Sequence, residues 1–288
     1  MNRYELEKVQ ASQNNAFTCY KHRGKLFTRS LHLHPEIELL YVEEGRGNCI
    51  VANSFVPYKE GDLFFFHANL PHCFKSDENY HSLNNHAESR SICIQFTQGI
   101  LPADYMVMPG CKHIRSLLKA GEQGIKWDDM RENPLITDLQ QMDTTDGFER
   151  LHKLYELLNT MGCMTERGTR IASDSYVLPK SSSDTNYYQI IRYINLHFRR
   201  TITLEEIASA VNMNISAMCR YFKAKAGQTI FDYLLNVRIA IVKEILATTD
   251  KPISLAAYEC GFNSIPNFNI YFKRTTGLSP TEFRKKMR

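Results

Sequence analysis

YFKAKAGQTI (residues 221–230) is followed, fifty residues later, by YFKRTTGLSP (residues 271–280). Each stretch begins with Tyr-Phe-Lys and reaches a glycine at its seventh position, Gly227 and Gly277. A glycine directly after a helical run is typical of a helix C-terminus, because glycine adopts the left-handed conformation there without steric cost. The repeat therefore predicts two similarly built helical motifs close together in the chain.

The first motif spans TLEEIASAVNMNISAMCRYFKAKAG (residues 203–227). Thr203 followed by Glu206 is the pattern of a capping box and starts a short helix, and Asn214 can cap a second helix that runs from residue 215 to about 226. The residues that face inward on this second helix, at one-face spacing, are Met218, Tyr221 and Phe222. Those that face outward are Ser216, Arg220 and Lys223. Two short helices with a basic outer face predict a helix-turn-helix.

The second motif, PISLAAYECGFNSIPNFNIYFKRTTG (residues 252–277), follows the same pattern. Ser264 is expected to cap its second helix, and Pro266 fits the first turn, where its missing N–H is not needed. The inward row is Phe268, Tyr271 and Phe272, and the outward residues are Asn267, Asn269, Ile270 and Arg274. Residues 231–250 between the motifs predict one helix of about five turns. Two motifs on one rod are expected to meet successive major grooves, about 34 Å apart.

The positive charge of the chain is concentrated at this end. Residues 184–288 contain 15 Lys and Arg against 8 Asp and Glu, whereas the preceding residues contain 20 against 23. Such an asymmetry indicates an anionic partner for the C-terminal domain, and nucleic acid is the commonest one.

The 288 residues, 43% of them hydrophobic, suggest two domains. The chain shows neither an apolar leader nor a run long enough to span a membrane, so we expect a cytoplasmic protein. Its eight cysteines form no Cys-x-x-Cys pair, which favours reduced thiols over a zinc or disulfide framework.

The first hundred residues show the pattern of β-strands. GDLFFF and RSICIQF are rich in β-branched and aromatic residues and lie between turn signals, which predicts a sandwich or barrel over residues 17–98. FERLHKLYELLNTM (residues 148–161) instead predicts an amphipathic helix. Its apolar face is expected to comprise Phe148, Leu151, Leu154, Tyr155, Leu158 and Met161. This face can serve dimerisation, join the domains, or pack on the barrel of its own chain.

Residues 187–288 resemble the paired helix-turn-helix domain of AraC/XylS-type bacterial transcription regulators. The resemblance rests on Tyr221-Phe222-Lys223 to Gly227, Cys260-Gly261-Phe262-Asn263, Phe272-Lys273-Arg274, and Gly277-Leu278-Ser279-Pro280 to Phe283-Arg284. It implies base contacts from Ser216, Ala217, Cys219, Arg220, Ile265, Asn267 and Asn269. We assign phosphate contacts to Asn214, Lys223, Ser264, Lys273 and Arg274, and also to Lys285 and Lys286. The resemblance assigns no catalytic residue.

Ile270 departs from this family, whose members commonly have arginine at the position that corresponds to Arg220. Arginine recognises guanine through two hydrogen bonds, whereas isoleucine can only contact a thymine methyl group. We therefore expect the second motif to discriminate between base pairs less sharply than the first.

The stretch LHLHPEIELLYVEEG (residues 31–45), with the later His72, resembles the metal-binding pattern of cupin barrels. The resemblance implies that His32, His34, Glu38 and His72 line an effector pocket or chelate a divalent metal. His32 and His34 are expected on one side of a strand, and Pro35 is expected to interrupt that strand and shift the phase of Glu38. A metal site, a metal-free pocket and a purely structural cluster remain alternatives, because His67 and Asn69 stand where metal cupins have Pro and Gly.

The sequence thus predicts a multi-domain α+β protein: an N-terminal cupin-like β-barrel with following helices, then an all-α domain in which a long helix joins two helix-turn-helix motifs. The expected parts are a sensing domain (1–110), a helical linker or dimerisation region (111–172), a flexible linker (173–186) and a DNA-binding domain (187–288). The predicted function is a ligand-responsive, sequence-specific transcription regulator, non-enzymatic and homodimeric, with double-stranded DNA and a small effector, by family analogy a sugar, as partners. The alternatives are a metal-dependent cupin enzyme with an accessory nucleic-acid-binding domain, and an architectural DNA-binding protein.

Overall fold

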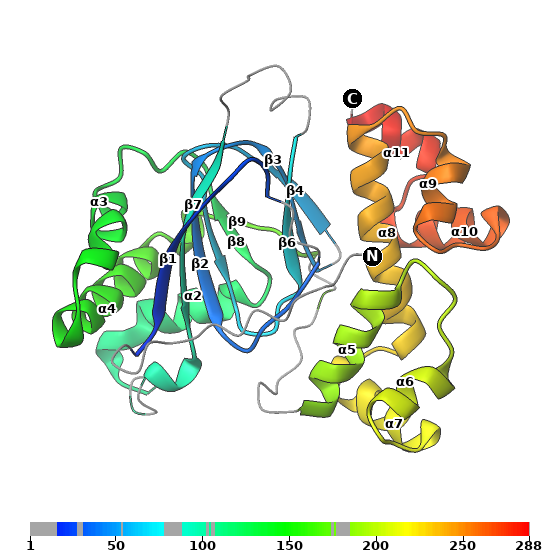
Figure 1. Cartoon of the computed structure of the whole chain (residues 1–288), viewed down its shortest axis with the longest axis horizontal. Coiled ribbons are helices and arrows are strands. Elements are labelled where there is room, and N and C mark those ends of the chain that lie inside the picture. Colours follow the sequence, from blue (N-terminus) through cyan, green and yellow to red (C-terminus); the bar gives the residue numbers. More distant parts are fainter. Residues whose placement is uncertain are drawn as a thin grey trace. The chain divides into compact units, whose positions relative to one another are not determined.

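The computed structural model describes residues 16–27, 31–52, 54–77, 88–101, 104, 107–173, 176 and 185–287. These residues separate near residue 174 into two compact units. The first is built on β-sheets and the second on helices (Figure 1). None of the helices in the described part is long and apolar enough to cross a membrane.

The first unit contains two antiparallel sheets. Its described strands are β1 (Thr18–Gly24), β2 (Ile37–Glu44), β3 (Gly47–Val51), β4 (Ser54–Tyr58), β5 (Leu63–Phe66), β6 (His72–Ser76), β7 (Ser89–Phe96), β8 (Ile125–Trp127) and β9 (Thr169–Arg170). The larger sheet has the order β1-β7-β2-β5-β8-β9 and the smaller one the order β4-β3-β6. Neighbours in the larger sheet are therefore distant in sequence, and this order brings β2 and β7 together at the candidate site.

The larger sheet is covered on both faces, which explains the continuous apolar run of β5. Leu63 and Phe65 belong to the core that the sheet shares with the helices of this unit. Phe64 and Phe66 point the other way, and their rings lie 5.0 and 6.1 Å from that of Phe74 on the smaller sheet. Since successive strand residues alternate between faces, β5 needs apolar residues at every position.

Three α-helices of the described part of this unit pack on the larger sheet. They are α2 (Lys112–Gly121), α3 (Pro134–Gln141) and α4 (Gly147–Cys163), accompanied by the short turns η1 (Gln98–Ile100), η3 (Pro109–Cys111), η4 (Met142–Thr144) and η5 (Thr165–Arg167). The end of α2 approaches β5 closely, because a Cβ at Gly121 would lie 2.6 Å from the Phe65 ring. Glycine therefore permits this helix-to-sheet contact.

The segment 111–172 differs from the expected helical linker. It adds β8 and β9 to the larger sheet, and it lies in the first unit. Leu154 and Leu158 are fully buried in the core shared with the barrel, which matches the interpretation that α4 packs on the barrel of its own chain. The prediction was wrong for Phe148, which is 78% exposed, because this residue lies in the first turn of α4 outside the buried face.

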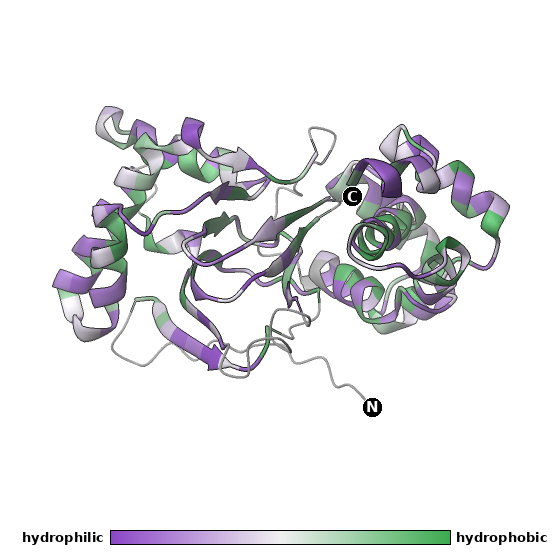
Figure 2. Ribbon diagram, turned by 90° about the horizontal axis from the view of Figure 1, so that it is seen from above, coloured by the Kyte–Doolittle hydropathy of each residue, from purple (hydrophilic) through white to green (hydrophobic). Residues whose placement is uncertain are grey.

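From residue 185 onward, the described part of the second unit is built of helices and the short segments that join them. Its helices are α5 (Thr185–His197), α6 (Leu204–Ala210), α7 (Ile215–Ala226), α8 (Ile230–Thr248), α9 (Ile253–Glu259), α10 (Ile265–Thr276) and α11 (Pro280–Met287). The long helix α8 packs against α5, α7, α9, α10 and α11. Figure 1 shows α5 to α7 at one end of α8 and α9 to α11 at the other. The shorter helices combine hydrophobic and hydrophilic residues, as Figure 2 shows, which is the pattern of helices with one buried face.

The local signals of both motifs have their predicted roles. Thr203 and Glu206 form a capping box at the start of α6. The side chains of Asn214 and Ser264 accept hydrogen bonds from the first turns of α7 and α10. Gly227 and Gly277 follow these helices with φ of 66° and 75°. The repeated sequence therefore specifies where each second helix begins and ends.

Candidate nucleic-acid interface and polar cluster of the barrel

The outer face of α7 is polar and exposed, as predicted. Ser216, Arg220 and Lys223 are exposed, whereas Met218 and Phe222 are fully buried beneath them. Among the described residues, neither Arg220 nor Lys223 takes part in an ion pair. Their charges are therefore available to a partner. The remaining predicted base-contact residues of this helix, Ala217 and Cys219, are half-buried.

The outer face of α10 has a different chemistry. Asn267, Asn269 and Ile270 are exposed, with Ile270 at 64%, while Ile265 is half-buried. Two carboxamides and one aliphatic side chain thus occupy the region where α7 presents arginine. The cations lie one turn later, at the exposed Lys273 and Arg274.

Both helix caps retain a donor for a second role. Oδ1 of Asn214 accepts from the backbone N–H groups of Ser216 and Ala217, at 2.9 and 3.4 Å. Its amide NH₂ remains a donor, and the hydroxyl of Ser264, which accepts from Asn267 N–H at 3.5 Å, can still donate its proton. Capping is therefore compatible with the predicted phosphate contacts of both residues.

A buried polar cluster lies in the first unit, on the face of the larger sheet that carries Phe64 and Phe66. Glu38 on β2 and Gln95 on β7 are direct cross-strand partners. Nε2 of Gln95 donates to Oε2 of Glu38 at 2.7 Å. Phe66, the partner of Glu38 on the other side, stacks its ring at 4.4 Å on that of His72. Sheet register therefore assembles the cluster from three adjacent strands.

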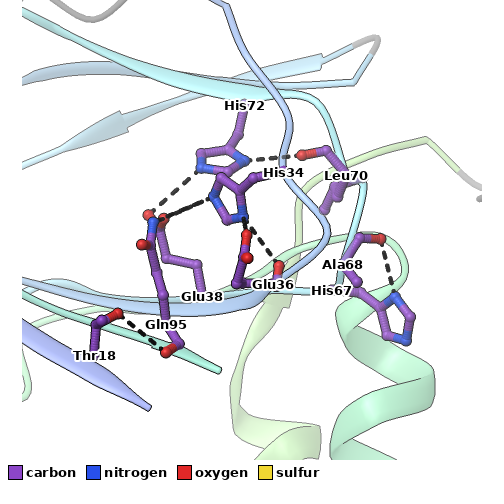
Figure 3. A network of polar contacts seen from close by, with 9 residues as sticks. All are labelled: Thr18, His34, Glu36, Glu38, His67, Ala68, Leu70, His72 and Gln95. Carbon is purple, nitrogen blue, oxygen red and sulfur yellow. Dashed lines mark hydrogen bonds and ion pairs between the residues drawn. The ribbon is translucent and has the colours of Figure 1, made fainter. Parts of the chain in front are cut away.

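Histidines complete this cluster (Figure 3). Nε2 of His34 lies 2.9 Å from Oε2 of Glu38, and Nε2 of His72 lies 3.5 Å from Oε1. His32 pairs with His72 through backbone hydrogen bonds, and their rings are 4.6 Å apart. One ring nitrogen from each of the three histidines lies within 4.8 Å of the others.

The neighbours of Glu38 keep it ionised. Burial raises the pKa of a carboxyl group, but the positive charge and hydrogen bonds of His72 and His34 outweigh burial and hold the pKa of Glu38 well below 4.5. Burial likewise opposes the charged form of His34. Its hydrogen bonds with the carboxylates of Glu36 and Glu38 outweigh that cost and raise the pKa of His34 to about 9.

The structure corrects two expectations about these residues. His32 and His34 do not lie within a strand, because His32 forms only an isolated bridge and β2 begins at Ile37, after Pro35. Pro35 ends the preceding segment without moving Glu38 out of the site, and Glu38 is 3% exposed at its centre. His72 faces the cluster as expected.

Gln95 is the residue that sequence reasoning missed. In RSICIQF, Ile92, Ile94 and Phe96 alternate with polar or small residues, so Gln95 is a polar residue on an otherwise buried strand face. That signal was present in the sequence. Its pairing with Glu38 depends on the β2–β7 register, which local sequence does not reveal.

The donor set fits a divalent metal. Nδ1 of His72 is 2.8 Å from the carbonyl of Leu70, and Nδ1 of His34 is 3.1 Å from that of Glu36. A ring N–H held by a carbonyl is the usual support of a metal-bound histidine, whose Nε2 is then the coordinating atom. At His34 a metal would displace the Nε2 proton that is now shared with Glu38, because a coordinating imidazole is neutral. His67 does not belong to the set, since its Nδ1 turns to the carbonyl of Ala68 (Figure 3).

Comparison with known proteins supports this division of the chain. A cupin-domain family model matches residues 25–81, and a helix-turn-helix-domain model matches residues 207–286. The chain is 26% identical over 255 residues to the HTH-type transcriptional activator RhaR of Shigella dysenteriae serotype 1 (strain Sd197), covering 88% of this chain and 86% of RhaR. These matches support the resemblance to AraC-type regulators that have an N-terminal cupin domain.

Two further proteins are similar to this chain. The probable transcriptional regulator LumQ of Photobacterium leiognathi is 30% identical over 126 residues, which cover 44% of this chain and 49% of LumQ. The crystal structure of ToxT from Vibrio cholerae O395 bound to (E)-4-(8-methylnaphthalen-1-yl)but-3-enoic acid covers 95% of this chain and 100% of ToxT, with 14% identity and a TM-score of 0.41.

This pairing of domains is that of a ligand-responsive, DNA-binding transcription regulator. The relatives named above are regulators of transcription, which favours the non-enzymatic interpretation over a cupin enzyme.

Proposed function

We propose that this regulator binds operator DNA through α7 and α10 and binds a sugar or related metabolite at the polar cluster of its barrel. The residues proposed to contact bases are those that the family resemblance implies, with Arg220 as the main base-reading side chain. The residues proposed to contact phosphates are those assigned above from the sequence. The protein is proposed to act in the cytoplasm as a homodimer.

The observation that carries the DNA-binding role is the pair of capped helices with exposed polar faces. Each is anchored from below by two fully buried residues, Met218 and Phe222 in α7 and Phe268 and Phe272 in α10. Anchoring of this kind holds an outer face rigidly, so that side chains such as Arg220 reach base edges in a major groove.

The chemistry of the cluster supports a polyhydroxylated effector. Glu38 is an ionised acceptor, while Gln95 and the histidines offer donors as well as acceptors. A sugar hydroxyl both donates and accepts, so it can exchange hydrogen bonds with such a mixed group. The choice of a sugar over other polyols or acids comes from the family resemblance.

The proposed regulation links the two domains. Effector binding changes how the barrel and the following segment constrain the helix-turn-helix domain, and thereby changes which half-sites a dimer reaches. Equal affinity and equal half-site spacing with and without saturating effector would contradict this coupling.

Selection of random duplexes by the purified full-length chain, with and without a panel of sugars, tests the proposal. We expect enrichment of a sequence with two blocks about one helical turn apart. We also expect at least one sugar to alter its affinity or the spacing of the selected sites. If no sequence were enriched over non-specific binding, the proposed operator recognition would be wrong. If a sequence were enriched but no sugar altered its binding, only the proposal of a sugar effector would be rejected.

His32, His34, Glu38 and His72 are also our candidate ligands for a divalent transition metal. Titration with Co²⁺ tests this, because its visible absorption reports nitrogen and oxygen coordination. We expect the absorption bands to be lost in His34→Ala and His72→Ala. They should persist in His67→Ala, since that histidine points away from the cluster. Absence of such bands in the wild-type protein would favour the metal-free pocket.

A further inference from the structure

A junction in the second unit connects the two helix-turn-helix motifs beside α8. Arg238, near the middle of α8, is 9% exposed, and its guanidinium donates to the carbonyl of Phe198 at 2.7 Å and to that of Arg200 at 2.8 Å. These two residues directly follow α5, at the entrance to the first motif. Arg238 thus satisfies carbonyl groups at a helix end that would otherwise lack donors.

The bend of the second motif meets the same place. Gly261, between α9 and α10, has φ of 86°. A Cβ at this position would lie 2.5 Å from the carbonyl oxygen of Phe198 and 2.9 Å from the backbone of Arg199. The bend of the second motif therefore packs against the backbone segment that leads into the first motif, and only glycine allows both the conformation and the distance.

Two more contacts strengthen this junction. Nδ2 of Asn263, in the bend of the second motif, donates to Oγ1 of Thr201, in the loop before α6, at 3.1 Å. The guanidinium of Arg238 also lies 5.8 Å from the centre of the Phe262 ring. Among the described residues no carboxylate forms an ion pair with Arg238, so these carbonyl and ring contacts are what hold its charge in place.

The junction restricts how the two motifs can rotate relative to each other about α8. A single helix that joins two bodies can pivot at its ends, whereas a second point of attachment opposes rotation about the helix axis. The chain already joins the motifs through α8, and the Arg238–Phe198–Gly261 junction provides the second attachment. The outer faces of α7 and α10 are consequently presented at one separation and one relative rotation.

We propose that Arg238 and Gly261 are positioning residues that set which spacing between the two operator blocks this regulator accepts. Neither residue needs to touch DNA. This inference rests on the proposed function, since it assumes that α7 and α10 bind the same duplex. One added base pair moves the blocks apart by about 3.4 Å and rotates them by about 35°. A rigid pair of motifs is expected to reject such a change, whereas a loosened pair is expected to tolerate it.

The experiment uses the full-length chain and a series of duplexes derived from its selected operator, with one or two base pairs inserted or deleted between the two blocks. Arg238→Met removes the hydrogen bonds but keeps the aliphatic stem, and Arg238→Lys restores the charge. Gly261→Ala inserts a wedge at the backbone contact. Gly227→Ala is the control, because it also places alanine at a positive φ, of 66°, but with nothing within 4 Å of the added Cβ.

For the wild-type protein we expect affinity to fall at least tenfold on insertion of one base pair. The Arg238→Met and Gly261→Ala variants should bind the operator about five- to tenfold more weakly at the native spacing. Their affinities should vary less than threefold across the series, and the Arg238→Lys variant should be intermediate. Gly227→Ala should keep the wild-type spacing profile. Thermal unfolding by circular dichroism identifies variants that fail to fold, and Arg238→Lys keeps the test valid if Arg238→Met is among them.

Three results separate the possibilities. If the wild-type protein selected no operator, the proposed function would fail first. If it bound its operator equally well at all spacings, the positioning role would be wrong although DNA recognition stood. If Gly261→Ala and Gly227→Ala gave the same spacing profile, the junction would be a matter of stability alone, and the inference would be rejected.

Discussion

His34 and Glu38 form a buried ion pair, with Nε2 of the imidazole 2.9 Å from Oε2 of the carboxylate. Both side chains are almost completely buried, so each charge depends on the other for its solvation. The pair stabilises the charged form of each partner, so it raises the pKa of His34 and lowers the pKa of Glu38. Its contribution to stability is consequently limited to a window of pH.

The first prediction concerns this window, in protein freed of metal by a chelator. The contribution of Glu38 is present above its unfolded pKa near 4.5 and is lost as the pH falls through its lower folded value. That of His34 is complete below pH 6.5 and is lost as the pH rises to about 9. The free energy of unfolding should therefore be greatest between about pH 4.5 and 6.5, and fall by on the order of 3 kcal/mol from pH 6.5 to 9.

Urea unfolding monitored by the fluorescence of Trp127 measures this change in the first unit. Trp127 is the only tryptophan of the chain, and it is buried in the core of that unit. The decline between pH 6.5 and 9 should vanish in His34→Gln. It should persist in His67→Gln, because burial lowers the pKa of His67 and places its titration below this range. An unchanged decline in His34→Gln would show that another group titrates.

Substitution of Gln95 gives the second prediction. In Gln95→Leu the carboxylate of Glu38 loses a donor at 2.7 Å, which should cost about 1–3 kcal/mol of unfolding free energy at pH 6. Gln95→Glu should cost more at that pH, because a second buried carboxylate is placed beside the first, and its stability should recover partly in acid. Equal stability of the two variants at all pH values would contradict the proposed contact with an ionised Glu38.

The local features of the second unit could be predicted from sequence because they are encoded over four or fewer residues. Asn214 and Ser264 each cap a helix through nearby N–H groups, and Gly227 ends one at a position where an added Cβ would meet nothing within 4 Å. The junction at Arg238 was not predictable, since it joins residues about forty positions apart. An arginine within an apolar helix indicates that its charge has a hydrogen-bonding partner, but the sequence does not show which residue that partner is.

In the first unit, too, local sequence patterns could be predicted, whereas features that depend on distant parts of the chain could not. The His-x-His-xxx-Glu pattern identified His34 and Glu38, and a later block identified His72. The structure brings these three residues together, although the strand expected to carry His34 does not form. The exposure of Phe148 was missed because helical periodicity identifies a face without showing where its partner surface ends.

The third prediction separates base contact from phosphate contact in the second unit. Arg220→Ala should weaken binding to the selected operator by about 1–3 kcal/mol and relax preference at a single base pair. Lys273→Ala should weaken all sequences alike and reduce the slope of log affinity against log salt concentration by about one. Both residues are exposed, so neither change should disturb folding.

Fluorescence anisotropy with the operator, single-base variants and unrelated duplexes at several salt concentrations measures both effects. A uniform loss across all duplexes for both variants would contradict a base-reading role for Arg220. A sequence-selective loss for Lys273→Ala would move that residue from the phosphate contacts to the base contacts.

The fourth prediction concerns Ile270, which occupies the position in α10 that Arg220 occupies in α7. Because Ile270 is 64% exposed, its replacement leaves no cavity and should change the thermal unfolding temperature little. Ile270→Arg supplies the two parallel donors that guanine accepts. Duplex selection with this variant should therefore reveal guanine at one further base pair, with a gain of about 1–3 kcal/mol over the other bases there. Ile270→Lys is the matched control, since its charge should strengthen binding to all sequences by a similar factor without the new preference. If both variants gained affinity uniformly, the outer face of α10 would lie against the phosphate backbone, and the assignment of Asn267 and Asn269 to base contacts would be wrong.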